Sequence, residues 1–146
     1  MKNIFYSLML LGLFLGSISE VVAQNKIKQM VAKKWKITQF DFPEANNLSE
    51  EQRKVFDTMM KDMYNNSFLD FKKDGSFEIQ MSFNGDKQIS KGVWEVSDDG
   101  KTLTTIESQN DNKSTGVLSI IEISEAKMVL SNEEGGKKVL MTLENF

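Results

Sequence analysis

The chain has 146 residues, of which 18 are lysine or arginine and 21 are aspartate or glutamate, so its formal net charge is −3 at pH 7. It has no histidine and no cysteine, which excludes disulfides, thiol nucleophiles, histidine-based catalytic triads and the usual zinc and copper sites. Its lysines are scattered along the chain, whereas phosphate binding needs clustered cations. We therefore expect no nucleic-acid partner.

The first segment, residues 1–23, has the pattern of a secretory signal peptide. Lys2 precedes an apolar run from Ile4 to Leu15, and residues 21–23 supply small side chains before a cut at Gln24. The run is shorter than the ~20 apolar residues that span a bilayer, and no cysteine follows it that could carry a lipid. We expect an exported protein, periplasmic or extracellular, with no stable membrane anchor after cleavage.

The remaining segment, residues 24–146, is long enough for one domain with one hydrophobic core. Residues 25–33 carry apolar side chains at helical spacing, which indicates one or two short amphipathic turns. Residues 34–40 alternate polar and apolar side chains. They form a predicted first strand with Trp35 and Ile37 on one face.

A longer amphipathic helix is predicted from Ser49 onward. The sequence of residues 49–52, Ser-Glu-Glu-Gln, has the form of a capping box. Apolar side chains then recur at i, i+3, i+4, i+7 and i+8 and form one stripe, which consists of Phe56, Met59, Met60, Met63 and Tyr64. The stripe is either an adaptable methionine-rich lid over a cavity mouth or ordinary core that plugs the end of the fold.

From residue 67 onward the hydrophobic period changes from 3.6 to 2, and turn residues separate short strands. The strands predicted here are 68–72, 77–83, 87–96, 101–107, 117–124, 127–131 and 137–143, with a polar loop at 108–113. With the first strand this makes eight, joined mainly by short turns, which favours an antiparallel up-and-down barrel because closure removes both exposed edges. A two-sheet sandwich is the alternative, but it usually needs long crossovers.

The order and spacing of several segments carry a family likeness. They are Lys34-Trp35-Lys36-Ile37, Phe71-Lys72-Lys73-Asp74-Gly75-Ser76-Phe77, Gly92-Val93-Trp94-Glu95-Val96, Asp98-Asp99-Gly100-Lys101-Thr102-Leu103 and Ile120 to Leu130. Together they resemble the small secreted lipocalin-like domains common in Bacteroidetes bacteria. The resemblance implies an all-β fold: an eight-stranded antiparallel lipocalin or calycin-like barrel, with one amphipathic helix between strands one and two capping an end, that binds a small apolar molecule.

Two positions depart from that family. Its first strand usually begins Gly-x-Trp, and this chain has Lys33 where the glycine would be. Larger members pack an arginine over the tryptophan, but the only arginine here, Arg53, lies on the predicted helix. Lys137 and Lys138 are the remaining, poorer substitutes, because lysine does not stack and fork as arginine does.

The candidate ligand-binding residues are the apolar side chains that alternation and helical spacing direct toward the barrel interior. They are Trp35, Ile37, Phe56, Met59, Met60, Met63, Phe71, Phe77, Met81, Phe83 and Trp94. In a barrel filled with side chains the same residues would be plain core, since eight strands enclose either a packed interior or room for one small ligand.

No catalytic residue, metal site or cofactor is predicted. The oxygen-rich turns at residues 98–100 and 110–112 do not continue into the calcium-loop pattern, and no motif with a catalytic mechanism occurs. The first hypothesis is an exported barrel that binds a small hydrophobic or amphipathic ligand non-covalently. The alternative is a filled barrel that serves as an interaction or structural module of the cell envelope and recognises a protein or glycan by its surface; no particular protein partner is predicted. A hydrolase, which would need two facing carboxylates in a cleft, is the third and least favoured hypothesis.

Overall fold

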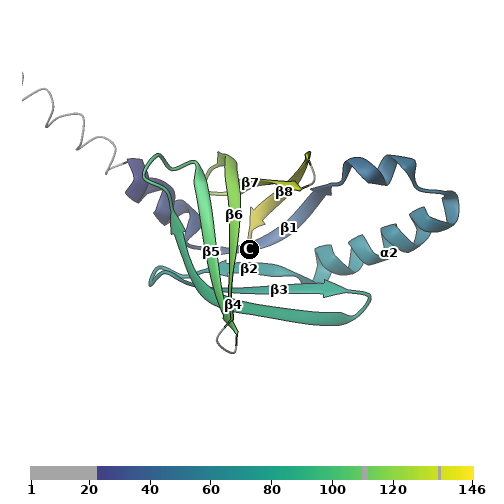
Figure 1. The fold of residues 1–146 in the computed structure, drawn as a ribbon, viewed down its shortest axis with the longest axis horizontal. Helices are drawn as coiled ribbons and strands as arrows, with labels where there is room; N and C mark the ends of the chain where they lie inside the picture. The colour runs from purple at the N-terminus through teal and green to yellow at the C-terminus, as the bar shows by residue number, and fades with distance from the viewer. Residues whose placement is uncertain (1–22, 110–111, 135) are drawn as a thin grey trace, which may run out of the picture.

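The computed structural model describes residues 23–109, 112–134 and 136–146 (Figure 1). Residues 1–22, nearly all of the predicted signal peptide, lie outside the described residues. Within the described ranges, no helix is long and apolar enough to cross a membrane.

Eight antiparallel strands form one closed barrel in sequence order, which confirms the predicted architecture. The strands are β1 (Lys34–Asp41), β2 (Phe68–Phe71), β3 (Ser76–Phe83), β4 (Asp86–Val96), β5 (Thr102–Gln109), β6 (Asn112–Ile123), β7 (Lys127–Glu134) and β8 (Lys137–Asn145). A short 3₁₀ helix, η1 (Pro43–Asn47), and helix α2 (Glu50–Asn66) connect β1 to β2. A further helix covers residues 23–31. Figure 1 shows this helix and α2 at opposite ends of the molecule.

The predicted loop at residues 108–113 is wrong for most of its length. β5 continues to Gln109 and β6 begins at Asn112, with Ser108 paired to Lys113. Polar side chains are compatible with this ribbon because the exposed ends of a hairpin have water on both faces. β7 likewise extends to Glu134, past the predicted end of the strand, because it continues to pair with β8.

The capping box of α2 is confirmed. The Ser49 hydroxyl accepts a hydrogen bond from the backbone N–H of Gln52 (3.3 Å), and the Gln52 side chain accepts one from the backbone N–H of Ser49 (2.9 Å). These two bonds satisfy donors that the first turn of a helix otherwise leaves free.

Helix α2 fills the space where the short strand β2 does not reach. β2 has only four residues, and α2 precedes it directly, packing against β3 and β1. On one side the Tyr64 hydroxyl accepts a hydrogen bond from the backbone N–H of Phe40 in β1 (3.1 Å). On the other side the Asp62 carboxylate accepts hydrogen bonds from Ser82 Oγ (2.9 Å) and from the backbone N–H of Gly85 (2.8 Å).

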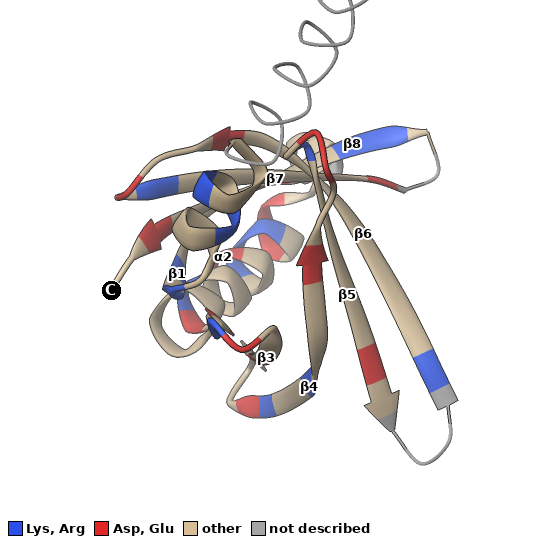
Figure 2. Cartoon of the chain, turned by 90° about the vertical axis from the view of Figure 1, so that its left-hand side faces the viewer, with Lys and Arg blue, Asp and Glu red and all other residues tan. Residues whose placement is uncertain are grey.

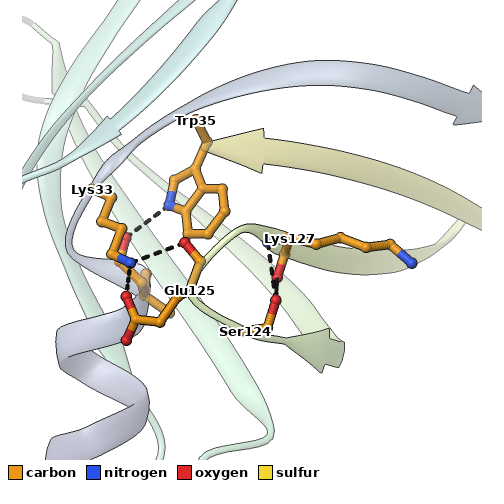
Figure 3. A network of polar contacts seen from close by, with 6 residues as sticks. Lys33, Trp35, Ser124, Glu125 and Lys127 are labelled. Carbon is orange, nitrogen blue, oxygen red and sulfur yellow. Dashed lines mark hydrogen bonds and ion pairs between the residues drawn. The ribbon is translucent and has the colours of Figure 1, made fainter. Parts of the chain in front are cut away.

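The opposite end is closed around the first tryptophan (Figure 3). Trp35 Nε1 donates a hydrogen bond to the Val31 carbonyl (2.9 Å), and both residues are completely buried. Lys33 Nζ donates to the backbone carbonyl of Glu125 (3.0 Å) and pairs with its carboxylate. Lys33, at the position of the family's glycine, thus ties the helix at residues 23–31 to the β6–β7 turn.

Candidate ligand-binding site

The barrel wall opens between β4 and β5. These strands pair only from Gly92–Glu107 to Val96–Leu103. β3 and β4 continue pairing to Phe83–Asp86, and β5 and β6 continue to Gln109–Asn112. Beyond Gly92, therefore, the β3–β4 and β5–β6 hairpins separate, and Figure 2 shows β4 and β5 diverging.

β6 and β7 separate at the same end of the barrel. Their described pairs run from Ser119–Ser131 to Ile123–Met128, so the first half of β6 pairs with β5 alone. We call this end, where the hairpins splay, the open end, and the end beneath residues 23–31 the closed end.

Gly92 marks the point at which β4 leaves β5. A Cβ atom built there would lie 2.0 Å from the carbonyl oxygen of Ile106, which no real side chain could tolerate. Only glycine lets the two backbones approach this closely.

Apolar side chains that face the interior at the open end remain partly exposed. Register places Ile79, Met81 and Phe83 on the same face as Leu69 and Phe71, which are buried. The same pattern recurs on other strands, and the further inward-facing, partly buried residues are Phe40, Leu118, Ile120 and Met141. The β3–β4 hairpin, which carries Ile79, Met81 and Phe83, has separated from β5 at this level, so no strand of the described residues borders it on that side.

The sequence-predicted candidates divide between the two ends. Those buried in the packed core are Trp35, Ile37, Met60, Met63, Phe71, Phe77 and Trp94. Those left partly exposed are Phe56, Met59, Met81 and Phe83. In the buried set, the rings of Phe71 and Trp94 lie 5.6 Å apart and Trp94 Nε1 donates to the Lys72 carbonyl (3.0 Å). Such contacts are typical of a packed core. The partly exposed candidates lie instead beside the opening of the barrel.

The first half of α2 projects beyond the barrel and keeps part of its apolar stripe uncovered. A shallow hollow of about 430 Å³ lies on one side of Phe56, and another of about 370 Å³ lies on the other side. The Phe42 ring stacks on Phe40 (4.6 Å) and meets the edge of Phe56 (6.0 Å). These ring contacts connect Phe40 of β1 to the apolar stripe of α2.

The carboxylate of Asp62 connects α2 to the β3–β4 hairpin. Hydrogen bonds from the Gly85 backbone, then Asn66 and Ser82, lower the pKa of Asp62 below its ordinary value of 3.8. Because these donors favour the ionised carboxylate, the connection is made at neutral pH.

The candidate residues predicted from the sequence did not include Glu107, Ile79, Leu118 or Ile120. Glu107 pairs with Gly92 and is two residues from Thr105, which is buried. Alternation along Leu103, Thr105 and Glu107 was the available signal. It assigns Glu107 to the interior face.

The described residues contain no group of three or more histidine, cysteine, aspartate or glutamate side chains that could hold a metal ion. At the open end the inward face of β3 is apolar, whereas Gln88, Ser90 and Glu107 make the inward faces of β4 and β5 polar. Such a lining combines apolar surface that can be removed from water with a few polar groups.

Residues 31–130 match the family described as "lipocalin-like domain". The chain belongs to the lipocalin-like domain family. A crystal structure of a lipocalin-like protein from Bacteroides uniformis is similar in fold, with a TM-score of 0.50 at 18% sequence identity, covering 80% of this chain and 99% of that one. No curated protein matches the sequence. These findings confirm the family and the barrel that the sequence resemblance implied.

Proposed function

We propose that this lipocalin-like protein is an exported binding protein that holds one small hydrophobic or amphipathic molecule, non-covalently, at the open end of its barrel. The observation that carries the proposal is the set of inward-facing apolar side chains that the splayed hairpins leave uncovered. Their burial by a ligand would be favourable by ~25 cal/mol per Å² of apolar surface removed from water.

Helix α2 would act as an adjustable wall of this site. Met59 and Phe56 are partly exposed, whereas Met60 and Met63 are buried beside them. Unbranched methionine side chains adopt several shapes at low cost, so the same face can fit ligands of different outline.

Export to the periplasm or outside the cell is part of the proposal. It is supported by the signal-peptide pattern of residues 1–23 and by the contacts of Gln24, the first residue after the expected cut. The Gln24 side chain donates to the Val96 carbonyl (3.3 Å) and to Asp98 (2.9 Å), so the folded domain already includes this residue.

The test uses two neighbouring positions of β6 with opposite orientations. Leu118 faces the interior and is partly buried, whereas Val117 faces out and is 57% exposed. The neutral fluorophore N-phenyl-1-naphthylamine should bind the wild type saturably. Leu118→Trp should weaken this binding about ten-fold or more by filling the site. Val117→Trp should leave it unchanged, with near-ultraviolet circular dichroism confirming that both variants fold.

The proposal fails if the wild type shows no saturable binding, or if the two tryptophan variants behave alike. Native mass spectrometry of protein purified from its own host's envelope, with extraction of any released molecule, would then be expected to give the bare mass.

The second candidate is a filled barrel that acts as an envelope interaction or structural module. It is favoured by the closed end, whose interior is packed, and by apolar side chains on the outer surface, which are Ile89 (47% exposed), Val93 (55%), Val117 (57%) and Ile121 (51%). A bare mass in the native spectrum and absence of fluorophore binding would move the assignment to this candidate.

A further inference from the structure

An inward-facing carboxylate lies at the point where the barrel opens. Glu107 lies in the register row Gly92–Glu107–Ser114, the last row in which β4 still pairs with β5. The next row toward the closed end is Trp94–Thr105–Gly116, in which Trp94 and Thr105 are buried. Residues two apart on a strand point to the same face, and directly paired residues share a face. Glu107 therefore points to the same face as Thr105 and Trp94, which is the interior.

The residues that flank Glu107 on both adjoining strands are small. A glycine stands opposite it on β4 and a serine on β6. Gly116 is also small, and a Cβ atom built there would lie 2.7 Å from Thr105 Oγ1. Because Glu107 is partly exposed and its pairing partners are a glycine and a serine, a ligand group can reach its carboxylate.

The carboxylate of Glu107 has no charged partner within the part of the chain that the structure describes. Among the described residues, none forms an ion pair or hydrogen bond with Glu107. Register also turns Asp86 and Lys137 inward, at the first residues of β4 and β8; the other inward positions that the structure describes hold no lysine or arginine. The nearby Lys91 is on the outer face, where it pairs with Glu78 (2.9 Å).

Glu107 is half-buried and unpaired among the described residues, and a ligand that supplies a positive charge or a hydrogen-bond donor would form a charge-assisted contact with it. We propose that Glu107 determines the specificity of the site for cationic amphiphiles, which place a protonated amine at Glu107 and an apolar body against Ile79, Met81 and Leu118. The inference rests on the proposed function, and it selects against fatty acids, whose carboxylate would be repelled.

The test compares three probes with the same twelve-carbon chain: dodecylamine, dodecanol and dodecanoate, each below its micelle concentration and measured by displacement of N-phenyl-1-naphthylamine. The wild type should bind dodecylamine about ten-fold or more tightly than dodecanoate, with dodecanol between them. Glu107→Gln keeps the shape but removes the charge, and should reduce this preference to less than about two-fold while dodecanol binds as before.

The matched control is Glu95→Gln, which removes an exposed carboxylate from the outer face of β4. It should retain the full preference of the wild type for the amine. Equal binding of amine and carboxylate by the wild type, or an unchanged preference in Glu107→Gln, overturns the role of Glu107 but leaves ligand binding intact. Failure of the fluorophore and all three probes to bind the wild type overturns the proposed function itself.

Discussion

The two ends of the barrel use the same kind of residue with opposite results. At the closed end, Trp35, Leu103 and Leu143 face inward and are fully buried. At the open end, Met81 and Met141 also face inward but remain partly exposed.

For Met81 the difference lies in strand pairing, since β2 pairs with β3 only as far as Gln80. Met141 is paired on both sides, with Phe40 and Leu130, so strand pairing alone does not bury an inward-facing side chain. Inward direction and burial are therefore separate properties in this fold.

The largest effect is expected when two side chains of β8, one at each end of the barrel, are each shortened to alanine. Leu143 and Met141 are two residues apart on the same face, but Leu143 is fully buried. Leu143→Ala should lower the free energy of unfolding by about 2–5 kcal/mol, because it leaves a cavity in a packed core. Met141→Ala should lower it by less than about 2 kcal/mol, because less of its surface is buried.

Urea denaturation of both variants measures this difference. Equal losses for Leu143→Ala and Met141→Ala would mean that the open end is packed as tightly as the closed end, and the distinction between the ends would have to be abandoned.

A second substitution tests whether Gly92 is the point at which β4 separates from β5. In Gly92→Ala, the new Cβ atom in its ideal position would lie 2.0 Å from the carbonyl oxygen of Ile106, so β4 and β5 must move apart. We expect a loss of about 1–3 kcal/mol in the free energy of unfolding. Hydrogen exchange should report the loss as faster exchange in the β4–β5 pairs. In the control Gly116→Ala, the new Cβ atom meets only the Thr105 hydroxyl, at 2.7 Å, so the free energy of unfolding should fall by less. An equal or larger fall in Gly116→Ala would argue against Gly92 as the point of separation.

The smallest effect concerns the attachment of α2 at the open end. The pKa of Asp62 is lowered in the folded protein, mainly by the Gly85 backbone N–H and then by Asn66 and Ser82. Its stabilising contribution is therefore complete above the ordinary carboxyl pKa and is lost as the pH falls through the lower, folded value. Acidification below about pH 4 should loosen α2 from the β3–β4 hairpin.

The difference in urea midpoint between pH 7 and pH 3 measures this effect. It should be smaller in Asp62→Asn than in the wild type, while Asp57→Asn, an exposed change on the same helix, should follow the wild type. A pH response of Asp62→Asn identical to that of the wild type would remove Asp62 from this attachment.

Local patterns in the sequence determined most of the secondary structure. Alternation identified the strands, and the Ser49–Gln52 capping box located the start of α2, which the structure confirms. Turn residues were equally informative, since Asn84 and Gly85 both have positive φ angles (54° and 87°) in the β3–β4 turn. These features depend on neighbours within a few residues, so a single sequence suffices to read them.

Only the tertiary structure decided which inward-facing residues are core and where the barrel opens. Phe77 and Met81 have the same place in one alternating strand, yet only Phe77 is buried. Its burial depends on Phe71 and Gly92, which lie across the sheet from it. The interior position of Glu107 depends in the same way on how far β4 follows β5 before it turns away. Alternation gives the face of a strand, but the neighbours on that face come from distant parts of the chain, and their number depends on the register and length of every pairing around the barrel.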